Sequence, residues 1–281
     1  MFRPRCFKIQ PYPKNRLLYK SRFHSSRDDN KELTVYTNFN PELKAGIEVK
    51  RNLGLKKFLQ RTYISSMGGI CGGLLLAESV ALTPFSGNSL LCIGSGILAT
   101  VSGIIALNKG KYTIVHDENK CLKVENSITR KLGYSSLVGG MGLTLSPIVS
   151  TVSPTILTSA ICLSFLTMTG ASLFAYKCKS GSLLKYGPAL TGGLFGLVGL
   201  QILGLGSYLI IGPNILYESI SNIDSYGGIV LFSFLTASNT HDAIEMYKNK
   251  DPDHLKCATN FYMDFMNILI RFIGIMAKSK R

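Results

Sequence analysis

The sequence predicts an all-α, polytopic membrane protein, a bundle of seven transmembrane helices. Three observations carry this prediction. Only 17% of the 281 residues are charged, well below the roughly 25% that is usual in a soluble domain. Seven apolar segments each approach or exceed the ~20 residues that a helix needs to cross a bilayer. Basic residues are concentrated in alternate loops between these segments, as expected of a chain that crosses a membrane repeatedly.

The seven segments are separated by short stretches with turn residues such as Thr83-Pro84 and Ser153-Pro154. The loops after the second, fourth and sixth segments contain twelve Lys and Arg, whereas the loops after the first, third and fifth contain none. Because loops rich in Lys and Arg resist translocation, this asymmetry predicts the orientation of the helices. The basic C-terminal tail would lie on the opposite side after seven crossings. The predicted segments are 63–83, 89–107, 132–151, 154–175, 187–211, 226–246 and 258–277.

The N-terminal part of the chain has a different composition. Residues 1–27 contain eight Lys and Arg, no acidic residue and no long apolar core, which is typical of a mitochondrial presequence rather than a secretory signal. A basic arm that touches anionic lipid or nucleic acid is the alternative. Residues 28–61 are interpreted as a basic linker on the matrix side, residues 62–278 as the seven-helix transmembrane domain, and residues 279–281 as a basic tail.

The net charge of +15 would by itself suggest a nucleic-acid partner, but its distribution indicates targeting and membrane orientation instead. No catalytic triad order, His-Glu-x-x-His motif or phosphate loop is present, and the seven Cys are scattered singly. Gly94-x-Gly96-x-x-Ala99 fits a dinucleotide pattern but lies inside an apolar segment. We therefore expect no enzyme activity, no cofactor and no metal site. The expected partners are the lipid bilayer and inner-membrane proteins.

Ionisable side chains inside apolar segments are costly and often mark a functional site. Asp264 lies about two turns into the last segment, and Arg271 follows seven residues later on the same helical face. The sixth segment ends with a polar cluster that includes Asn239, His241 and Asp242. In one interpretation, Asp264 and these residues line a path for a proton or a metal ion. In the other, Asp264 pairs with Arg271, His241 or Asn239 and only holds the last helix in place.

Several runs of the sequence resemble one membrane-protein family. The stretches 141–147 (MGLTLSP), 157–176 and 226–233 (YGGIVLFS) resemble helices of the Bax inhibitor-1, or transmembrane Bax inhibitor motif, family. Asp251-Pro252 followed by Tyr262-Met263-Asp264 resembles its mitochondrial branch, the growth-hormone-inducible transmembrane proteins. The resemblance covers about residues 60–278 and includes all seven segments.

This resemblance implies a seven-helix bundle with the last helix central, in the mitochondrial inner membrane. It also implies roles in calcium and proton handling, cristae organisation and restraint of apoptosis. The family has two intramembrane aspartates that share protons, one of which corresponds to Asp264. The other belongs to an Asp-Thr-Gln motif that aligns with Asn239-Thr240-His241, so Asp242 or His241 would have to replace it. Two functions therefore stay open: handling of calcium ions or protons, and a non-transporting scaffold of the cristae.

Overall fold

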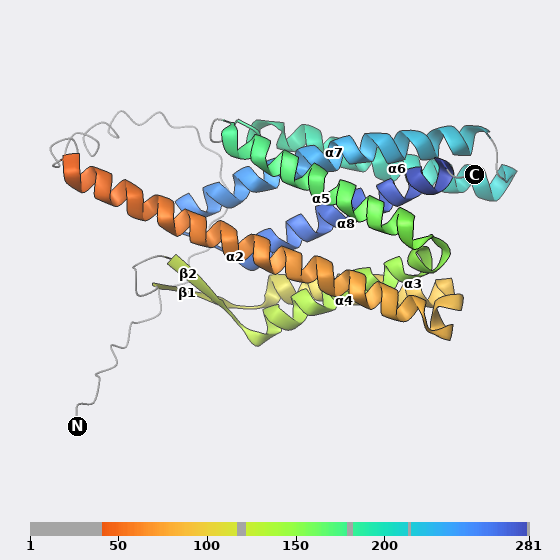
Figure 1. The fold of residues 1–281 in the computed structure, drawn as a ribbon, viewed down its shortest axis with the longest axis horizontal. Coiled ribbons are helices and arrows are strands. Elements are labelled where there is room, and N and C mark those ends of the chain that lie inside the picture. Colours follow the sequence, from red (N-terminus) through yellow and green to blue (C-terminus); the bar gives the residue numbers. More distant parts are fainter. Residues whose placement is uncertain (1–40, 117–121, 179–181, 213–214, 280–281) are drawn as a thin grey trace, which may run out of the picture. The chain divides into compact units, whose positions relative to one another are not determined.

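The computed structural model describes residues 41–116, 122–178, 182–212 and 215–279, and these form mainly seven long α-helices (Figure 1). Each predicted apolar segment lies almost wholly within one of them, which confirms the helical assignment. The predicted presequence 1–27 and the last two residues of the tail lie outside the described residues. The helices are α2 (Pro41–Ala81), α3 (Ser89–Lys109), α4 (Ile128–Thr151), α5 (Pro154–Lys177), α6 (Gly187–Ile211), α7 (Ile215–Lys248) and α8 (His254–Ser279).

Five of these helices are long and apolar enough to cross a membrane, judged by length and composition within the described residues. They are α2 from Leu53 onward and α3 to α6. The last two helices, α7 and α8, carry more polar side chains along their length, among them Asp224, Asn239, Asp264 and Arg271. The described residues thus contain five candidate membrane-spanning helices, as in a multi-pass membrane protein, rather than the seven spans that the sequence predicts.

Two helices extend by about ten residues or more beyond the boundaries that the sequence predicts. Helix α2 begins at Pro41, so the second half of the predicted linker 28–61 continues into the first apolar segment as one helix. Helix α7 begins at Ile215, so Glu218 and Asp224 belong to its first three turns rather than to a loop. Asp224 tolerates this position because it has a basic partner on α8, described below.

The purely α-helical prediction is wrong in one place. The loop after α3 contains an antiparallel hairpin of strands β1 (Tyr112–His116) and β2 (Leu122–Asn126), with Tyr112 opposite Asn126 and Ile114 opposite Val124. The β-branched run Thr113-Ile114-Val115 favours an extended chain. The hairpin packs on the side of the molecule where α7 ends and α8 begins, because Tyr112 contacts the turn between them.

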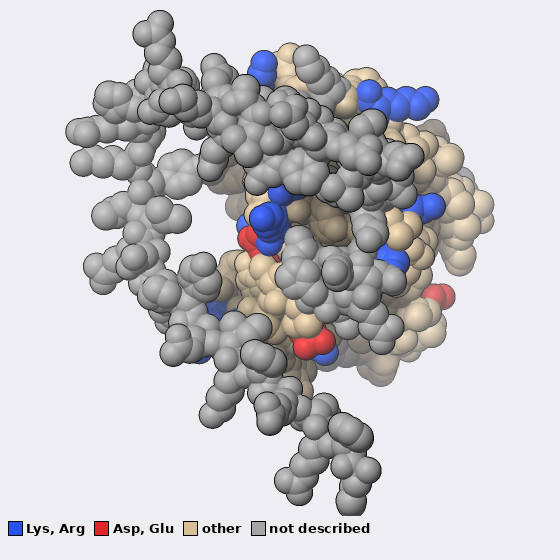
Figure 2. Space-filling view, turned by 90° about the vertical axis from the view of Figure 1, so that its left-hand side faces the viewer, with Lys and Arg blue, Asp and Glu red and all other residues tan. Residues whose placement is uncertain are grey.

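The basic loops lie together at one end of the molecule. Successive helices from α3 to α8 reverse direction, so the hairpin and the ends of α5 and α7 lie at the same end, on the left of Figure 1. Figure 2 views this end and shows Lys and Arg side chains at several places and Asp and Glu side chains at fewer. This arrangement is the one that the alternating loop charges require.

Helix α8 supplies much of the core. Its fully buried side chains Tyr262, Phe265 and Leu269 belong to the largest apolar cluster, which also includes residues of α2, α4 and α5. The ring of Phe165 on α5 lies 4.7 Å from the ring of Phe265. At the far end, Lys278 Nζ donates a hydrogen bond of 2.7 Å to Ser221 Oγ on α7. Helix α8 therefore lies alongside α7 from one end to the other.

Glycines allow α3 and α4 to pack closely. A side-chain carbon at Gly96 or Gly103 would overlap the backbone of Gly140 or Gly133 on α4. Small residues at such positions let helix backbones approach each other in a membrane. Gly96, part of the apparent dinucleotide motif, is thus explained by packing.

Candidate functional site

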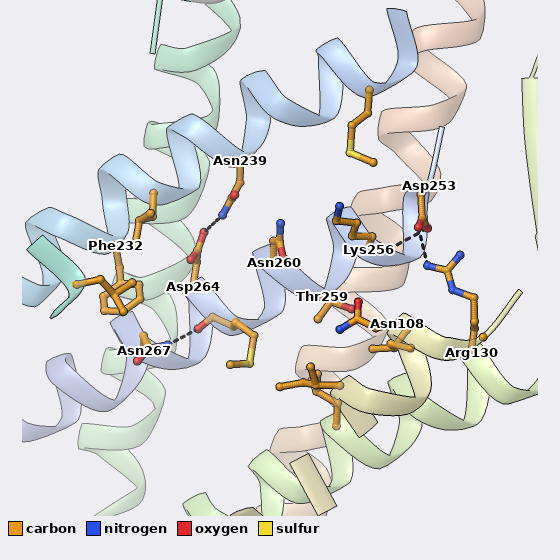
Figure 3. Close-up of a pocket in the computed structure, with 18 of the residues that line it drawn as sticks. Asn108, Arg130, Phe232, Asn239, Asp253, Lys256, Thr259, Asn260, Asp264 and Asn267 are labelled. Carbon is orange, nitrogen blue, oxygen red and sulfur yellow. Dashed lines mark hydrogen bonds and ion pairs between the residues drawn. The ribbon is translucent and has the colours of Figure 1, made fainter. Parts of the chain in front are cut away.

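Polar residues of α8 form a stripe along one face of the helix. Asn260, Asp264, Asn267 and Arg271 follow each other at intervals of three or four residues, which places them on the same side. All four line one cavity of about 720 Å³ between α8 and residues of α3, α4, α6 and α7. Figure 3 shows Asn239 of α7 pointing toward Asp264 of α8. The cavity therefore lies beside α8, the helix that carries Asp264.

Asp264 is the acidic group in the middle of this stripe. Its side chain is almost inaccessible, at 5% exposure. Two donors on α7 bind the same carboxylate oxygen, Oδ2: Asn239 Nδ2 at 2.7 Å and Thr236 Oγ1 at 3.2 Å. Thr236 and Asn239 are three residues apart, so they lie on the same face of α7. Asp264 belongs to neither of the two ion pairs described below, and the two groups that bind its carboxylate are neutral donors.

Arg271 pairs with a residue other than Asp264. Its Nη2 donates to Asp224 Oδ1 at 3.3 Å, and its Nε donates to the Asp224 carbonyl at 3.2 Å. The guanidinium also lies 4.8 Å from the centre of the Phe232 ring. The alternative in which Arg271 neutralises Asp264 is therefore wrong. Arg271 is also buried rather than extended toward the membrane surface.

A second ion pair lies at the opposite end of the cavity, near the basic loops. Arg130 at the start of α4 donates from Nη2 to Asp253 Oδ2 at 2.5 Å, and both side chains are buried. The Arg130 guanidinium lies 4.7 Å from the Tyr112 ring of the hairpin. Tyr112 Oη in turn donates to Asp251 Oδ1 at 2.8 Å. Arg130, Asp253, Tyr112 and Asp251 all line the cavity, so this network closes one of its ends.

The other predicted site residues on α7 point elsewhere. His241 Nε2 lies 2.8 Å from the Ala175 carbonyl on α5, so its ring faces away from Asp264. Asp242 is half-buried. The side chains that bond to Asp264 are those of Thr236 and Asn239, not that of Asp242. The sequence therefore placed Asn239 near Asp264 correctly, whereas neither His241 nor Asp242 replaces the absent carboxylate at that position.

Burial and hydrogen bonding alter the chemistry of the closing network. Burial and the hydrogen bond to Asp251 raise the pKa of Tyr112 to about 12. The phenol thus stays protonated and keeps donating to Asp251 throughout the physiological range. This keeps the hairpin attached to the turn between α7 and α8.

The chemistry of this cavity centres on Asp264. Its buried carboxylate accepts hydrogen bonds from the amide nitrogen of Asn239 and the hydroxyl of Thr236, and Asn239 and Asn267 also line the cavity. Oxygen ligands suit calcium ions, and a single carboxylate gives weaker binding than the several carboxylates of a high-affinity site. The same carboxylate can hold a proton instead, because burial disfavours an uncompensated charge. A cation and a proton can thus compete for one group.

Sequence reasoning missed Asp224, Arg130 and Asp253 as site residues. All three residues lie outside the predicted apolar segments, in the stretches between them. The spacing of Asn260, Asp264, Asn267 and Arg271 was the signal for a polar face on α8. No comparable pattern links Arg130 to Asp253, which are 123 residues apart.

Comparison with known families gives one match. A family model described as "Inhibitor of apoptosis-promoting Bax1" matches residues 55–281, which is well over half of the chain. The match includes α3 to α8, the hairpin and every residue of the cavity described above.

Proposed function

This chain belongs to the family of inhibitors of apoptosis-promoting Bax1, and from that premise we propose that it moves cations across the mitochondrial inner membrane. Family membership indicates an anti-apoptotic membrane protein. The observation that carries the transport proposal is Asp264, a buried carboxylate in a cavity between helices, with no ion-pair partner among the residues that the structure describes. The cations that suit this site are the calcium ion and the proton.

In this proposal, Asp264 binds either a cation or a proton, and entry of one releases the other. Asn239 and Thr236 orient the carboxylate by binding Oδ2, and the oxygen atoms of Asn239 and Asn267 replace part of the hydration shell of a calcium ion. The two ion pairs act as barriers, Arg130 with Asp253 at one end and Arg271 with Asp224 at the other. Transport requires these barriers to open in turn.

A liposome assay tests this proposal. The purified full-length protein is reconstituted with a calcium-sensitive dye inside the vesicles, and calcium entry is compared with Asp264→Asn. We expect Asp264→Asn to reduce calcium entry by at least tenfold. Asp242→Asn is the matched control, because it neutralises a half-buried carboxylate on α7 that does not bond Asp264. Equal calcium entry through wild type and Asp264→Asn would remove Asp264 from the mechanism.

The mitochondrial location rests on the first 27 residues and on the resemblance to the growth-hormone-inducible transmembrane proteins. In this proposal, residues 1–27 direct import and the basic loops face the matrix. A fusion of residues 1–40 to a fluorescent protein should enter mitochondria in living cells. A fusion that stays in the cytosol or enters the reticulum would contradict this part of the proposal.

A non-transporting scaffold of the cristae is the second candidate function. The observation in its favour is Asn239, which cannot titrate and instead holds Asp264 through a 2.7 Å hydrogen bond. In cells that lack the protein, Asp264→Asn would then restore cristae shape as well as the wild type does. Failure of Asp264→Asn to restore the shape would favour transport over scaffolding.

A further inference from the structure

A second, smaller cavity lies between α2, α5 and the C-terminal part of α7. It measures about 370 Å³ and is lined mainly by apolar side chains, with Ile70, Phe165 and Met168 among them. Thr240 lines this cavity whereas its neighbour Asn239 lines the first one, so α7 separates the two. An apolar cavity between helices suits an apolar ligand.

Ser66 on α2 is the unusual group in this cavity. Its side chain is 1% exposed, and its hydroxyl has no hydrogen-bond partner among the described residues. Other buried hydroxyls in these helices bond back to their own backbone, for example Thr62 to the Phe58 carbonyl at 3.1 Å. Buried polar groups normally have a partner. The Ser66 hydroxyl therefore matches a ligand with a hydrogen-bond acceptor.

The rim of the cavity shows the direction from which a ligand enters. Met67 on α2 and Leu173 and Tyr176 on α5 line the cavity and are each more than half exposed. Both helices are long and apolar enough to cross the membrane. Exposed apolar side chains on such helices face hydrocarbon, so the opening faces the lipid.

Basic residues lie at the same end of these two helices. Lys177 follows Tyr176 directly at the end of α5. Arg61 precedes Ser66 by five residues, about 7.5 Å along the axis of α2. The end of α5, which carries Lys177, lies at the end of the molecule with the basic loops (Figure 1), and Arg61 lies on the N-terminal side of Ser66 in α2. Positive charge at the membrane surface attracts anionic lipid headgroups.

We propose that this second cavity binds one acyl chain of an anionic glycerophospholipid. The ester carbonyl accepts a hydrogen bond from the Ser66 hydroxyl, and the phosphate lies beside Lys177 and Arg61. The acyl chain of the lipid fills the space next to Ile70, Phe165 and Met168. The bound lipid links α2 to α5 beside Thr240 of α7, in a cavity that Asp264 does not line, so its binding is separate from the proposed transport.

Native mass spectrometry of the full-length protein tests the proposal. Delipidated protein is mixed with dioleoyl phosphatidylglycerol or, for comparison, with dioleoyl phosphatidylcholine. We expect one phosphatidylglycerol to be retained, and Ser66→Ala to weaken its retention about fivefold, the loss expected for one hydrogen bond. Ser164→Ala is the matched control, because that buried hydroxyl bonds to Ala160 O on its own helix. Lys177→Gln should reduce the preference for the anionic lipid.

A second experiment needs no substitution and uses a photoreactive phosphatidylglycerol with a diazirine in its acyl chain to locate the bound lipid by crosslinking. Crosslinked peptides should come from α2 around Ile70 and from α5 around Met168. Equal retention by wild type and Ser66→Ala, equal retention of both lipids, or crosslinks confined to other helices would overturn the proposal. Asp264→Asn should retain the lipid, which separates this result from the transport assay.

Discussion

The Asn239 amide on α7 donates a 2.7 Å hydrogen bond to the buried carboxylate of Asp264 on α8. This contact joins α7 to α8 beside the larger cavity, which both residues line. The amide can donate to the carboxylate whether or not the carboxylate carries a proton, but it cannot release a proton itself. In the proposed transport, Asp264 is therefore the group that exchanges a proton at this contact.

Asn239→Asp should restore a pair of carboxylates at this contact. Two carboxylates at hydrogen-bond distance share one proton, because they cannot both stay ionised. We expect calcium entry through Asn239→Asp to depend more steeply on pH between 6 and 8 than entry through the wild type. Asn239→Ala removes the donor instead, and should destabilise the protein by about 2 kcal/mol without adding this pH dependence. Identical pH profiles for wild type and Asn239→Asp would contradict the assignment.

The Asp224–Arg271 pair should matter mainly for stability. Asp224→Asn leaves the buried guanidinium of Arg271 with no carboxylate, and breaking a buried ion pair in this way costs about 3 kcal/mol. The measurement is thermal unfolding in detergent. Glu218→Gln, which removes an exposed carboxylate near the start of the same helix, should change the stability little. The double variant Asp224→Asn/Arg271→Met should recover part of the loss, and no recovery would argue against a direct pair.

Two adjacent glycines on α7 should respond differently to alanine. A side-chain carbon at Gly228 would overlap the Arg271 guanidinium, whereas nothing lies within 4 Å of such an atom at Gly227. We expect Gly228→Ala to lower the free energy of unfolding by about 2 kcal/mol, the usual cost of overpacking. Gly227→Ala should be neutral or stabilising, since alanine favours a helix. Equal effects of the two substitutions would mean that Arg271 does not occupy the position described.

The hairpin should detach at high pH. The pKa of Tyr112 is raised to about 12 by burial and by its bond to Asp251, so the folded protein favours the neutral phenol. This stabilising contribution is complete below pH 10, the ordinary pKa, and is lost as the pH rises through about 12. The difference in tyrosinate absorbance between wild type and Tyr112→Phe should show a midpoint near 12. A midpoint near 10 would mean that Tyr112 is free of Asp251.

The helices were predictable because each apolar segment carries its own signal. The start of α7 was not, since Glu218 and Asp224 are typical of a loop and only the distant Arg271 explains Asp224 in a helix. The hairpin was not predicted from the sequence, because its strands are only five residues long and lie in a charged loop. The conformation of a short segment without a clear hydrophobic period depends on tertiary contacts, such as the hydrogen bond from Tyr112 to Asp251.

The candidate site was predictable only in part, for a similar reason. The depth of Asp264 and the polar end of the sixth segment were visible in the sequence. Which face of α7 meets α8 was not, because adjacent residues such as Asn239 and Thr240 face different cavities. The orientation of α7 about its own axis also explains why the His241 ring points toward Ala175 on α5.

Simultaneous measurement of calcium and proton movement tests the central claim most directly. Liposomes that contain the wild type, Asp264→Asn or Asp242→Asn are loaded with a calcium dye and a pH dye and given an inward calcium gradient. The account predicts that calcium entry drives protons out through wild type and Asp242→Asn, and that Asp264→Asn loses both movements together. Calcium and proton movements that persist unchanged in Asp264→Asn would contradict it.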